Sequence, residues 1–192
     1  DELVKNIRAF KKVDDLALAR HLPAFREPVA RAFIEDVANA NAAYSFSTGL
    51  LEVVPIANIP LNAADILVLT KNQAVLAYKI AVSMGLETDF KEIMPKLAAV
   101  LGGGFIFRQA ARSLVGLLPG LGLLPKVAVA FAGTYATGEA ILRWCINGEH
   151  MNAAALKDAY EIALARGKAI AQSLWDKRKL VKPPKALAAV RP

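Results

Sequence analysis

Apolar residues recur along most of the chain at intervals of three and four, the spacing that places them on one face of an α-helix. Val29, Phe33, Val37, Ala40 and Tyr44 form one such series. The pattern predicts an all-α fold, with helical hairpins packed into one bundle. The expected helices run from the start to about 20, and over about 27–50, 60–84, 90–101, 105–118, 125–147 and 153–178.

Proline and glycine residues mark where these helices start and stop. Pro28 suits a first helical turn, and Gly85 and Gly148 suit the left-handed residue that follows a helix. Pro55 and Pro119 lie 64 positions apart, and Gly85 and Gly148 lie 63 apart. A weak internal duplication of a helix–turn–helix unit would explain this spacing.

Two stripes of small or apolar residues predict close packing between helices. In the helix over 125–147, four alanines at intervals of four form a ridge that another helix can approach closely: Ala128, Ala132, Ala136 and Ala140. The last helix follows Asn152, a suitable N-cap. Its seam alternates intervals of four and three and suffices for one helix contact: Leu156, Tyr160, Ala163, Gly167, Ile170 and Leu174.

The composition is unusually apolar for a globular domain. The residues A, V, I, L, M, F, W, Y and C make up 55% of the chain, and the 12 glycines raise this to about 61%, against a norm of roughly 45–50%. The longest apolar windows are nevertheless broken: 113–138 contains Lys126 and 46–69 contains Glu52 and Asp65, besides prolines in both. A spanning helix needs about 20 apolar residues. These shorter apolar segments on either side of a turn therefore predict helical hairpins that are buried in a core or dip into one leaflet.

Basic residues are concentrated at the C-terminal end. The chain has 24 Lys+Arg and 17 Asp+Glu, a net charge of +7. Residues 166–192 hold eight basic residues and one acid and so carry +7, while residues 1–165 sum to zero. This distribution favours an anionic membrane surface over nucleic acid, because no aromatic residue besides Trp175 interleaves the lysines. A solvated terminus is the other interpretation. The expected membrane contacts are Lys177, Arg178, Lys179, Lys182 and Lys185.

Several charges fall inside the apolar half of the chain. A buried charge must be paired or neutralised, because removing it from water costs several kcal/mol. We therefore expect a buried cluster in which Arg108 or Arg112 meets Asp65 or Glu139. Glu139 and Arg143 are also neighbours one helical turn apart.

Signals of catalytic, metal or nucleotide sites are absent from the sequence. The single cysteine, Cys145, excludes a disulfide framework and a multi-thiolate metal site. The two histidines, His21 and His150, are expected at the surface or at a helix end. The glycines at 102–104 lack the following Lys and Ser/Thr of a phosphate-binding loop, and no Gly-x-Ser-x-Gly motif occurs. We expect no catalytic residue, no metal and no cofactor.

The hairpin residues resemble a bacterial family, domain of unknown function 697. The likeness covers roughly residues 28–148 and is carried by the runs Val54–Asp65 (VPIANIPLNAAD), Thr70–Gln73 (TKNQ), Leu101–Gly104 (LGGG) with Arg108 and Arg112, Leu118-Pro119 with Gly122, and Ala132–Gly138 (AGTYATG). Members are often joined to a Ras/Era-like GTPase domain, and others occur in bacterial inner-membrane proteins. The resemblance implies an auxiliary helical module, attached to a membrane or accessory to a GTPase.

We expect an N-terminal amphipathic helix over 1–26, an apolar helical-hairpin domain over 27–148, a C-terminal amphipathic helix over 149–178 and a basic tail over 179–192. The expected function is a non-catalytic anchor or assembly part on the cytoplasmic face of a bacterial inner membrane. Its expected partner is an anionic membrane surface or a membrane protein complex. The alternative is a cytoplasmic helical interaction domain that self-associates through the alanine ridge or the C-terminal seam.

Overall fold

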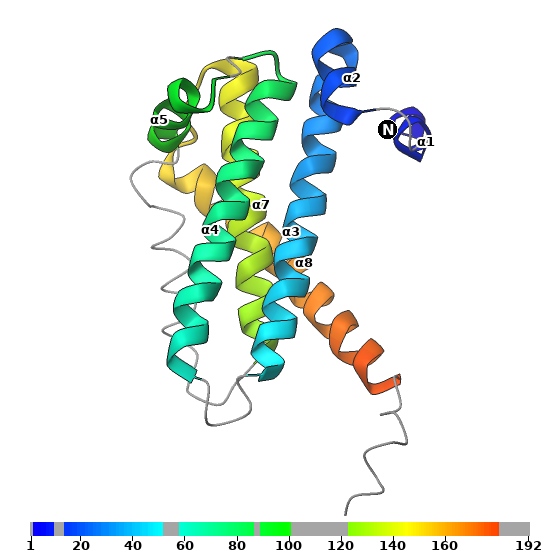
Figure 1. Cartoon of the computed structure of the whole chain (residues 1–192), viewed down its shortest axis with the longest axis vertical. Helices are drawn as coiled ribbons and strands as arrows, with labels where there is room; N and C mark the ends of the chain where they lie inside the picture. The colour runs from blue at the N-terminus through cyan, green and yellow to red at the C-terminus, as the bar shows by residue number, and fades with distance from the viewer. Residues whose placement is uncertain (1, 10–13, 52–57, 87–88, 101–122, 181–192) are drawn as a thin grey trace, which may run out of the picture.

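The computed structural model describes residues 2–9, 14–51, 58–86, 89–100 and 123–180. These residues form an all-α bundle, which confirms the predicted fold class (Figure 1). Its elements are α1 (Glu2–Ala9), α2 (Asp15–His21), a short 3-10 turn (Pro23–Phe25), α3 (Arg26–Leu51), α4 (Asn58–Ser83), α5 (Phe90–Val100), α7 (Leu123–Asn147) and α8 (Ala153–Leu180). The helix expected over 105–118 lies outside the described residues, and so do Pro55 and Pro119.

Local capping residues set the ends of the long helices, as the sequence predicts. Gly85 and Gly148 have φ angles of +88° and +70°, a backbone conformation that glycine adopts at little cost. The Gly85 N–H donates to the Val82 carbonyl oxygen at 3.1 Å and so closes α4. At the start of α8, Oδ1 of Asn152 accepts from the Ala155 N–H at 2.9 Å.

The N-terminal helix expected to run to about Arg20 is instead two helices. α1 ends at Ala9, and α2 begins after Asp14. Asp14 has an extended backbone (φ −76°, ψ 116°), which a continuous helix excludes, and its Oδ1 accepts from the Ala17 N–H at 2.7 Å. This N-cap satisfies a free donor of the new helix, so the chain starts a helix here rather than continuing one.

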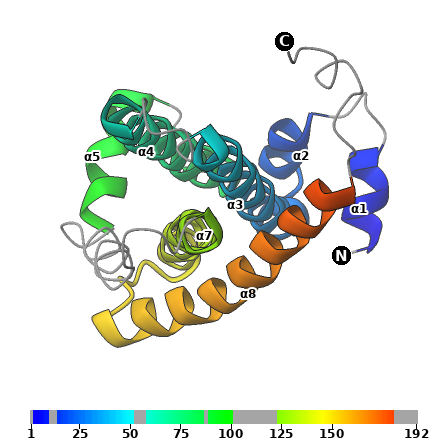
Figure 2. The same ribbon diagram turned by 90° about the horizontal axis from the view of Figure 1, so that it is seen from below.

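α7 is the central helix of the bundle. Figure 2 shows it almost end-on, with α3, α4, α5 and α8 around it. Nearly every residue from Val127 to Leu142 is buried, with Tyr135 the one half-buried position of that stretch. One apolar cluster joins α7 to α3 and α8, and a second joins it to α3, α4 and α5. The core is therefore arranged on all sides of a single helix.

The buried stripe of α3 differs from the series that the sequence suggested. Val29 of that series is fully buried, but Ala40 is exposed, and Phe33, Val37 and Tyr44 are half-buried. The buried positions are mainly small: Ala30, Ile34, Ala38, Asn41, Ala42 and Ser45. Small side chains let α3 and α7 come close together, and Ile34 packs against Gly138 of α7, while Phe33, Val37 and Tyr44 lie at the side of the contact.

Crossing a bilayer takes a longer or more apolar helix than any that the described residues form.

Candidate functional site at the crossing of α7 and α8

The predicted alanine ridge lies under α8. Ala128, Ala132, Ala136 and Ala140 are all buried, and the last three share an apolar cluster with the α8 residues Leu156, Tyr160 and Ala163. α8 runs obliquely to α3, α4 and α7, which are closer to parallel with one another (Figure 1). The ridge and the seam thus meet each other within one chain.

At Gly167, α8 lies directly against the backbone of α7. A Cβ atom built at this position would lie 2.7 Å from the carbonyl oxygen of Ala128 and 3.0 Å from its Cα. Both distances are shorter than ordinary van der Waals contact, and both atoms belong to the backbone of α7. Only a glycine at position 167 allows this approach, which fixes where α8 crosses α7.

On one side of the crossing, Arg166 of α8 forms an ion pair with Glu35 of α3. Its Nη2 donates to both carboxylate oxygens of Glu35, at 2.8 and 2.9 Å. The guanidinium carbon lies 4.9 Å from the ring centre of Tyr135 and 5.5 Å from that of Phe131. Burial raises the pKa of Tyr135, and the negative charges of Glu139 and Glu35 add to the effect. On this side an ion pair covers the contact between the helices, and its guanidinium group lies over two aromatic rings.

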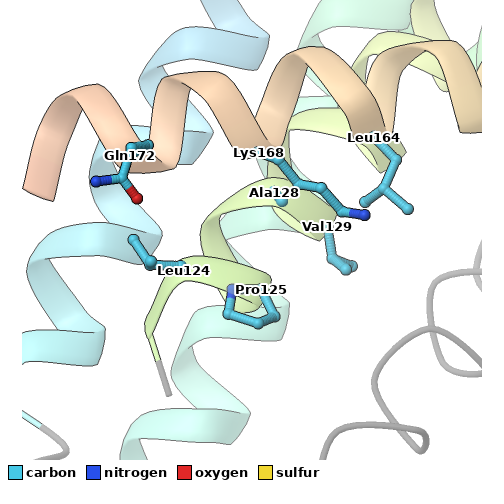
Figure 3. A pocket seen from close by; sticks show the side chains of 7 residues that line it. All are labelled: Leu124, Pro125, Ala128, Val129, Leu164, Lys168 and Gln172. Carbon is cyan, nitrogen blue, oxygen red and sulfur yellow. The ribbon is translucent and has the colours of Figure 1, made fainter. Parts of the chain in front are cut away.

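On the other flank the helices diverge and leave an apolar groove of about 480 Å³. Its lining residues come from the first two turns of α7 and from one face of α8: Leu124, Pro125, Ala128, Val129, Leu164, Lys168 and Gln172. In Figure 3 the side chains of Leu164 and Lys168 extend from α8 toward Val129, and that of Gln172 lies near Leu124. The walls are apolar, and Lys168 is the charged residue among them.

Lys168 differs from Lys157 and Arg166, two other cations of α8, in its surroundings. Nζ of Lys157 lies 3.6 Å from a carboxylate oxygen of Glu161, and Arg166 pairs with Glu35. Among the described residues, Lys168 has no carboxylate oxygen within 4.0 Å of its ammonium group. An exposed ammonium group at the edge of an apolar groove is available to an anionic group of a ligand.

The expected buried charge cluster is only partly within the described residues. Glu139 is buried, and its Oε1 accepts from Nη1 of Arg31 at 2.9 Å. Arg31 also pairs with Glu27 at 2.8 Å, so it links two acids. Sequence reasoning missed Arg31 because its local pattern indicates an ordinary surface pair at an interval of four. Arg143 is exposed.

The other members of the predicted cluster cannot be placed against Glu139. Arg108 and Arg112 lie outside the described residues, and so does the side chain of Asp65, whose backbone belongs to α4. Their pairing stays a prediction.

The basic end of α8 is exposed where it is described. Lys177 and Arg178 are exposed, and the Arg178 guanidinium carbon lies 5.4 Å from the ring centre of Trp175. Lys179 is part of α8, but its side chain and residues Lys182 and Lys185 lie outside the described residues. Figure 1 shows this end of α8 extending beyond the lower part of the bundle.

A polar network that sequence reasoning did not find lies between α3, α4 and α7. Nδ2 of Asn41 donates to Oγ1 of Thr134 at 2.8 Å, and Nδ2 of Asn72 donates to Oδ1 of Asn41 at 2.6 Å. Asn41 and Thr134 are fully buried. Thr134 also donates to the Ala130 carbonyl oxygen at 2.8 Å. These bonds satisfy polar groups in the core and hold three helices in register.

The remaining candidate groups do not assemble into a reactive site. Burial raises the pKa of Cys145 to about 12, so its thiol stays protonated at neutral pH. His21 and His150 are exposed. Within the part of the chain that the structure describes, no three His, Cys, Asp or Glu residues lie together in a way that could hold a metal ion.

No match to this chain was found among protein-family models, curated proteins or solved structures. The resemblance to domain of unknown function 697 therefore stays a prediction from the sequence.

Proposed function

We propose that this chain is a non-catalytic helical module that attaches peripherally to an anionic membrane surface, with α8 and the following basic segment as the contact. The bundle would serve as an anchor or assembly part at the cytoplasmic face of a bacterial inner membrane. An accessory role to a GTPase, which the sequence resemblance implies, belongs to the same proposal.

The observation that carries the proposal is the separation of charge between the body and the end of the chain. Residues 166–192 carry +7, and residues 1–165 are neutral in sum. Each basic residue near an anionic leaflet contributes about 1 kcal/mol of attraction. Lys177 and Arg178 are exposed on the part of α8 that extends beyond the bundle (Figure 1). They are therefore positioned to reach a membrane without any change in the core.

Trp175 marks where α8 leaves the core. It is half-buried, it packs against the apolar cluster that joins α7 to α3 and α8, and Arg178 covers its ring. The exposed residues Lys177 and Arg178 follow it, so the proposed membrane contact begins beyond the packed part of the helix.

Flotation with phosphatidylcholine vesicles, with and without phosphatidylglycerol, tests the proposal. The full chain should float with the anionic vesicles at low salt and remain in the bottom fraction of the gradient at high salt, because salt screens exposed charges. Reversing the charges of Lys177 and Arg178 to Glu should abolish flotation. The matched control reverses Lys91 and Lys96, two exposed lysines of α5, and should float like the unmodified chain. Equal flotation of the two variants, or no flotation of the unmodified chain at low salt, would contradict the proposal.

The geometry bears on the alternative, a helical interaction domain that self-associates through the ridge or the seam. Both surfaces are occupied within the chain, since Ala128 lies against Gly167 and Ala132 shares a core cluster with Tyr160. Self-association would therefore need another surface. Light scattering of the full chain in buffer without detergent, combined with flotation, separates the two functions. A stable oligomer that does not bind anionic vesicles would favour the alternative.

A further inference from the structure

We propose that the groove between α7 and α8 binds one acyl chain of an anionic phospholipid, with the Lys168 ammonium group beside the lipid headgroup. This inference rests on the proposed membrane attachment and adds to it a specific lipid site. It is carried by the shape of the groove, the chemistry of its walls and the charge at its edge.

The walls suit a hydrocarbon chain. Leu124, Pro125, Val129 and Leu164 present carbon atoms to the groove, and Ala128 lies between them and the α8 backbone (Figure 3). Ligand sites occupy roughly 300–1,000 Å³ and bury mostly apolar ligand surface. At about 480 Å³ the groove lies within that range. An acyl chain would remove these apolar side chains from water, which is favourable in proportion to the area covered.

The edge of the groove supplies the charge that an anionic headgroup needs. Lys168 is exposed, and the described lining residues include no carboxylate. Gln172 lies one turn further along α8, and its Nε2 donates to both carboxylate oxygens of Asp176, at 3.0 and 3.1 Å. That bond orients the amide beside the groove and engages the Asp176 carboxylate, so Lys168 is the charged side chain among the described lining residues.

The groove lies along the helix that also carries the proposed membrane contact. Lys168 and Gln172 follow one face of α8, since an interval of four residues completes about one turn. Lys177, nine residues after Lys168, lies on the opposite face of the same helix, so the groove and the basic end would contact lipid as two separate sites on α8.

Labelling by a photoactivatable lipid tests the inference. The full chain is mixed with phosphatidylcholine vesicles that contain phosphatidylglycerol with a diazirine in one acyl chain, irradiated, and digested for mass spectrometry. We expect adducts on the peptides that carry Val129 and Leu164. Gln172→Trp, which fills the groove, should prevent this labelling, whereas Ser173→Trp, at an exposed neighbouring position, should not. Both variants should float with the vesicles and show the thermal unfolding of the unmodified chain.

A second pair of variants tests the charge. Lys168→Glu should lower labelling of the groove at least about five-fold, because losing the attraction of one ammonium group already accounts for that factor and the new carboxylate adds repulsion. Lys157→Glu makes the same change of charge on the same helix, away from the groove, and should leave the labelling unchanged. Flotation with adducts outside the groove, or equal labelling of the Gln172→Trp and Ser173→Trp variants, would overturn the lipid site and leave membrane attachment standing. Absence of flotation would overturn both.

Discussion

Replacing Gly167 by alanine tests the contact between the backbones of α7 and α8. In most helices this substitution stabilises, because glycine in a helix interior costs about 0.5–1 kcal/mol relative to alanine. Here the new Cβ would lie 2.7 Å from the carbonyl oxygen of Ala128. Ordinary contact begins at 3.4 Å, so the two atoms must separate by 3.4 − 2.7 = 0.7 Å. The neighbouring atoms belong to the backbone of α7 rather than to a flexible side chain, so one helix must shift against the other.

The net effect follows from two opposing contributions. Overpacking of a close contact costs about 1–3 kcal/mol, and the gain in helix propensity offsets about 1 kcal/mol of it. We expect Gly167→Ala to lower the free energy of unfolding by about 1 kcal/mol. Gly133→Ala is the matched control, because Gly133 is also inside a helix and a Cβ atom there would have Nε2 of Gln73 as its nearest neighbour, 3.8 Å away. That variant should gain about 1 kcal/mol.

Urea unfolding followed by circular dichroism measures both variants. A difference of about 2 kcal/mol between them corresponds to roughly 1 M urea in the unfolding midpoint. The reasoning fails if Gly167→Ala is as stable as Gly133→Ala, because that result would mean that α8 does not cross α7 at Gly167.

Three further predictions concern the core and its titrating groups, and urea unfolding measures each. Asn41→Ala should cost about 2–3 kcal/mol, because it leaves buried partners without hydrogen bonds, whereas Asn39→Ala on the exposed side of the same helix should cost less than about 0.5 kcal/mol. Glu139→Gln should cost about 1 kcal/mol by weakening the ion pair that joins α7 to α3, and Glu27→Gln, in a more exposed pair, should cost less. Burial raises the pKa of Cys145 from 9.0 to about 12, so above pH 9 the unfolded chain loses a proton that the folded chain keeps. Stability should therefore fall between pH 9 and about 12, and a Cys145→Ala variant should show a smaller fall.

The sequence predicts best what is decided locally. Gly85, Gly148 and Asn152 end or start helices through their own backbone and side-chain preferences, so their roles follow from neighbouring residues alone. The break at Asp14 is also local, and its signal is an aspartate directly before a new apolar repeat. The single helix expected from the start to about 20 missed that signal. Leu3, Ile7 and Phe10 recur at helical intervals just before it, and such a regular apolar pattern does not show where one helix ends and the next begins.

Partners across the bundle could not be predicted from the sequence. Arg31 and Glu139 are 108 positions apart, and nothing in either local pattern selects the other. Asn41 is one of several polar residues on α3, and its burial depends on where α7 lies. The groove has the same origin, since it forms where α8 diverges from α7. The glycine at position 167 of the C-terminal seam indicates that another helix can approach closely there. A single sequence does not say which helix backbone does so.

The central place of α7 has a consequence for how the chain is synthesised. Thr134 follows Asn41 by 93 positions, so the partner of a buried asparagine leaves the ribosome long after the asparagine itself. At about 5–20 residues per second, that interval is roughly 5–20 s. Within this time the synthesis of α3 and α4 is completed, and the helix that covers them is still missing. The nascent chain therefore exposes an apolar surface that a chaperone or a nearby membrane can occupy before the bundle closes.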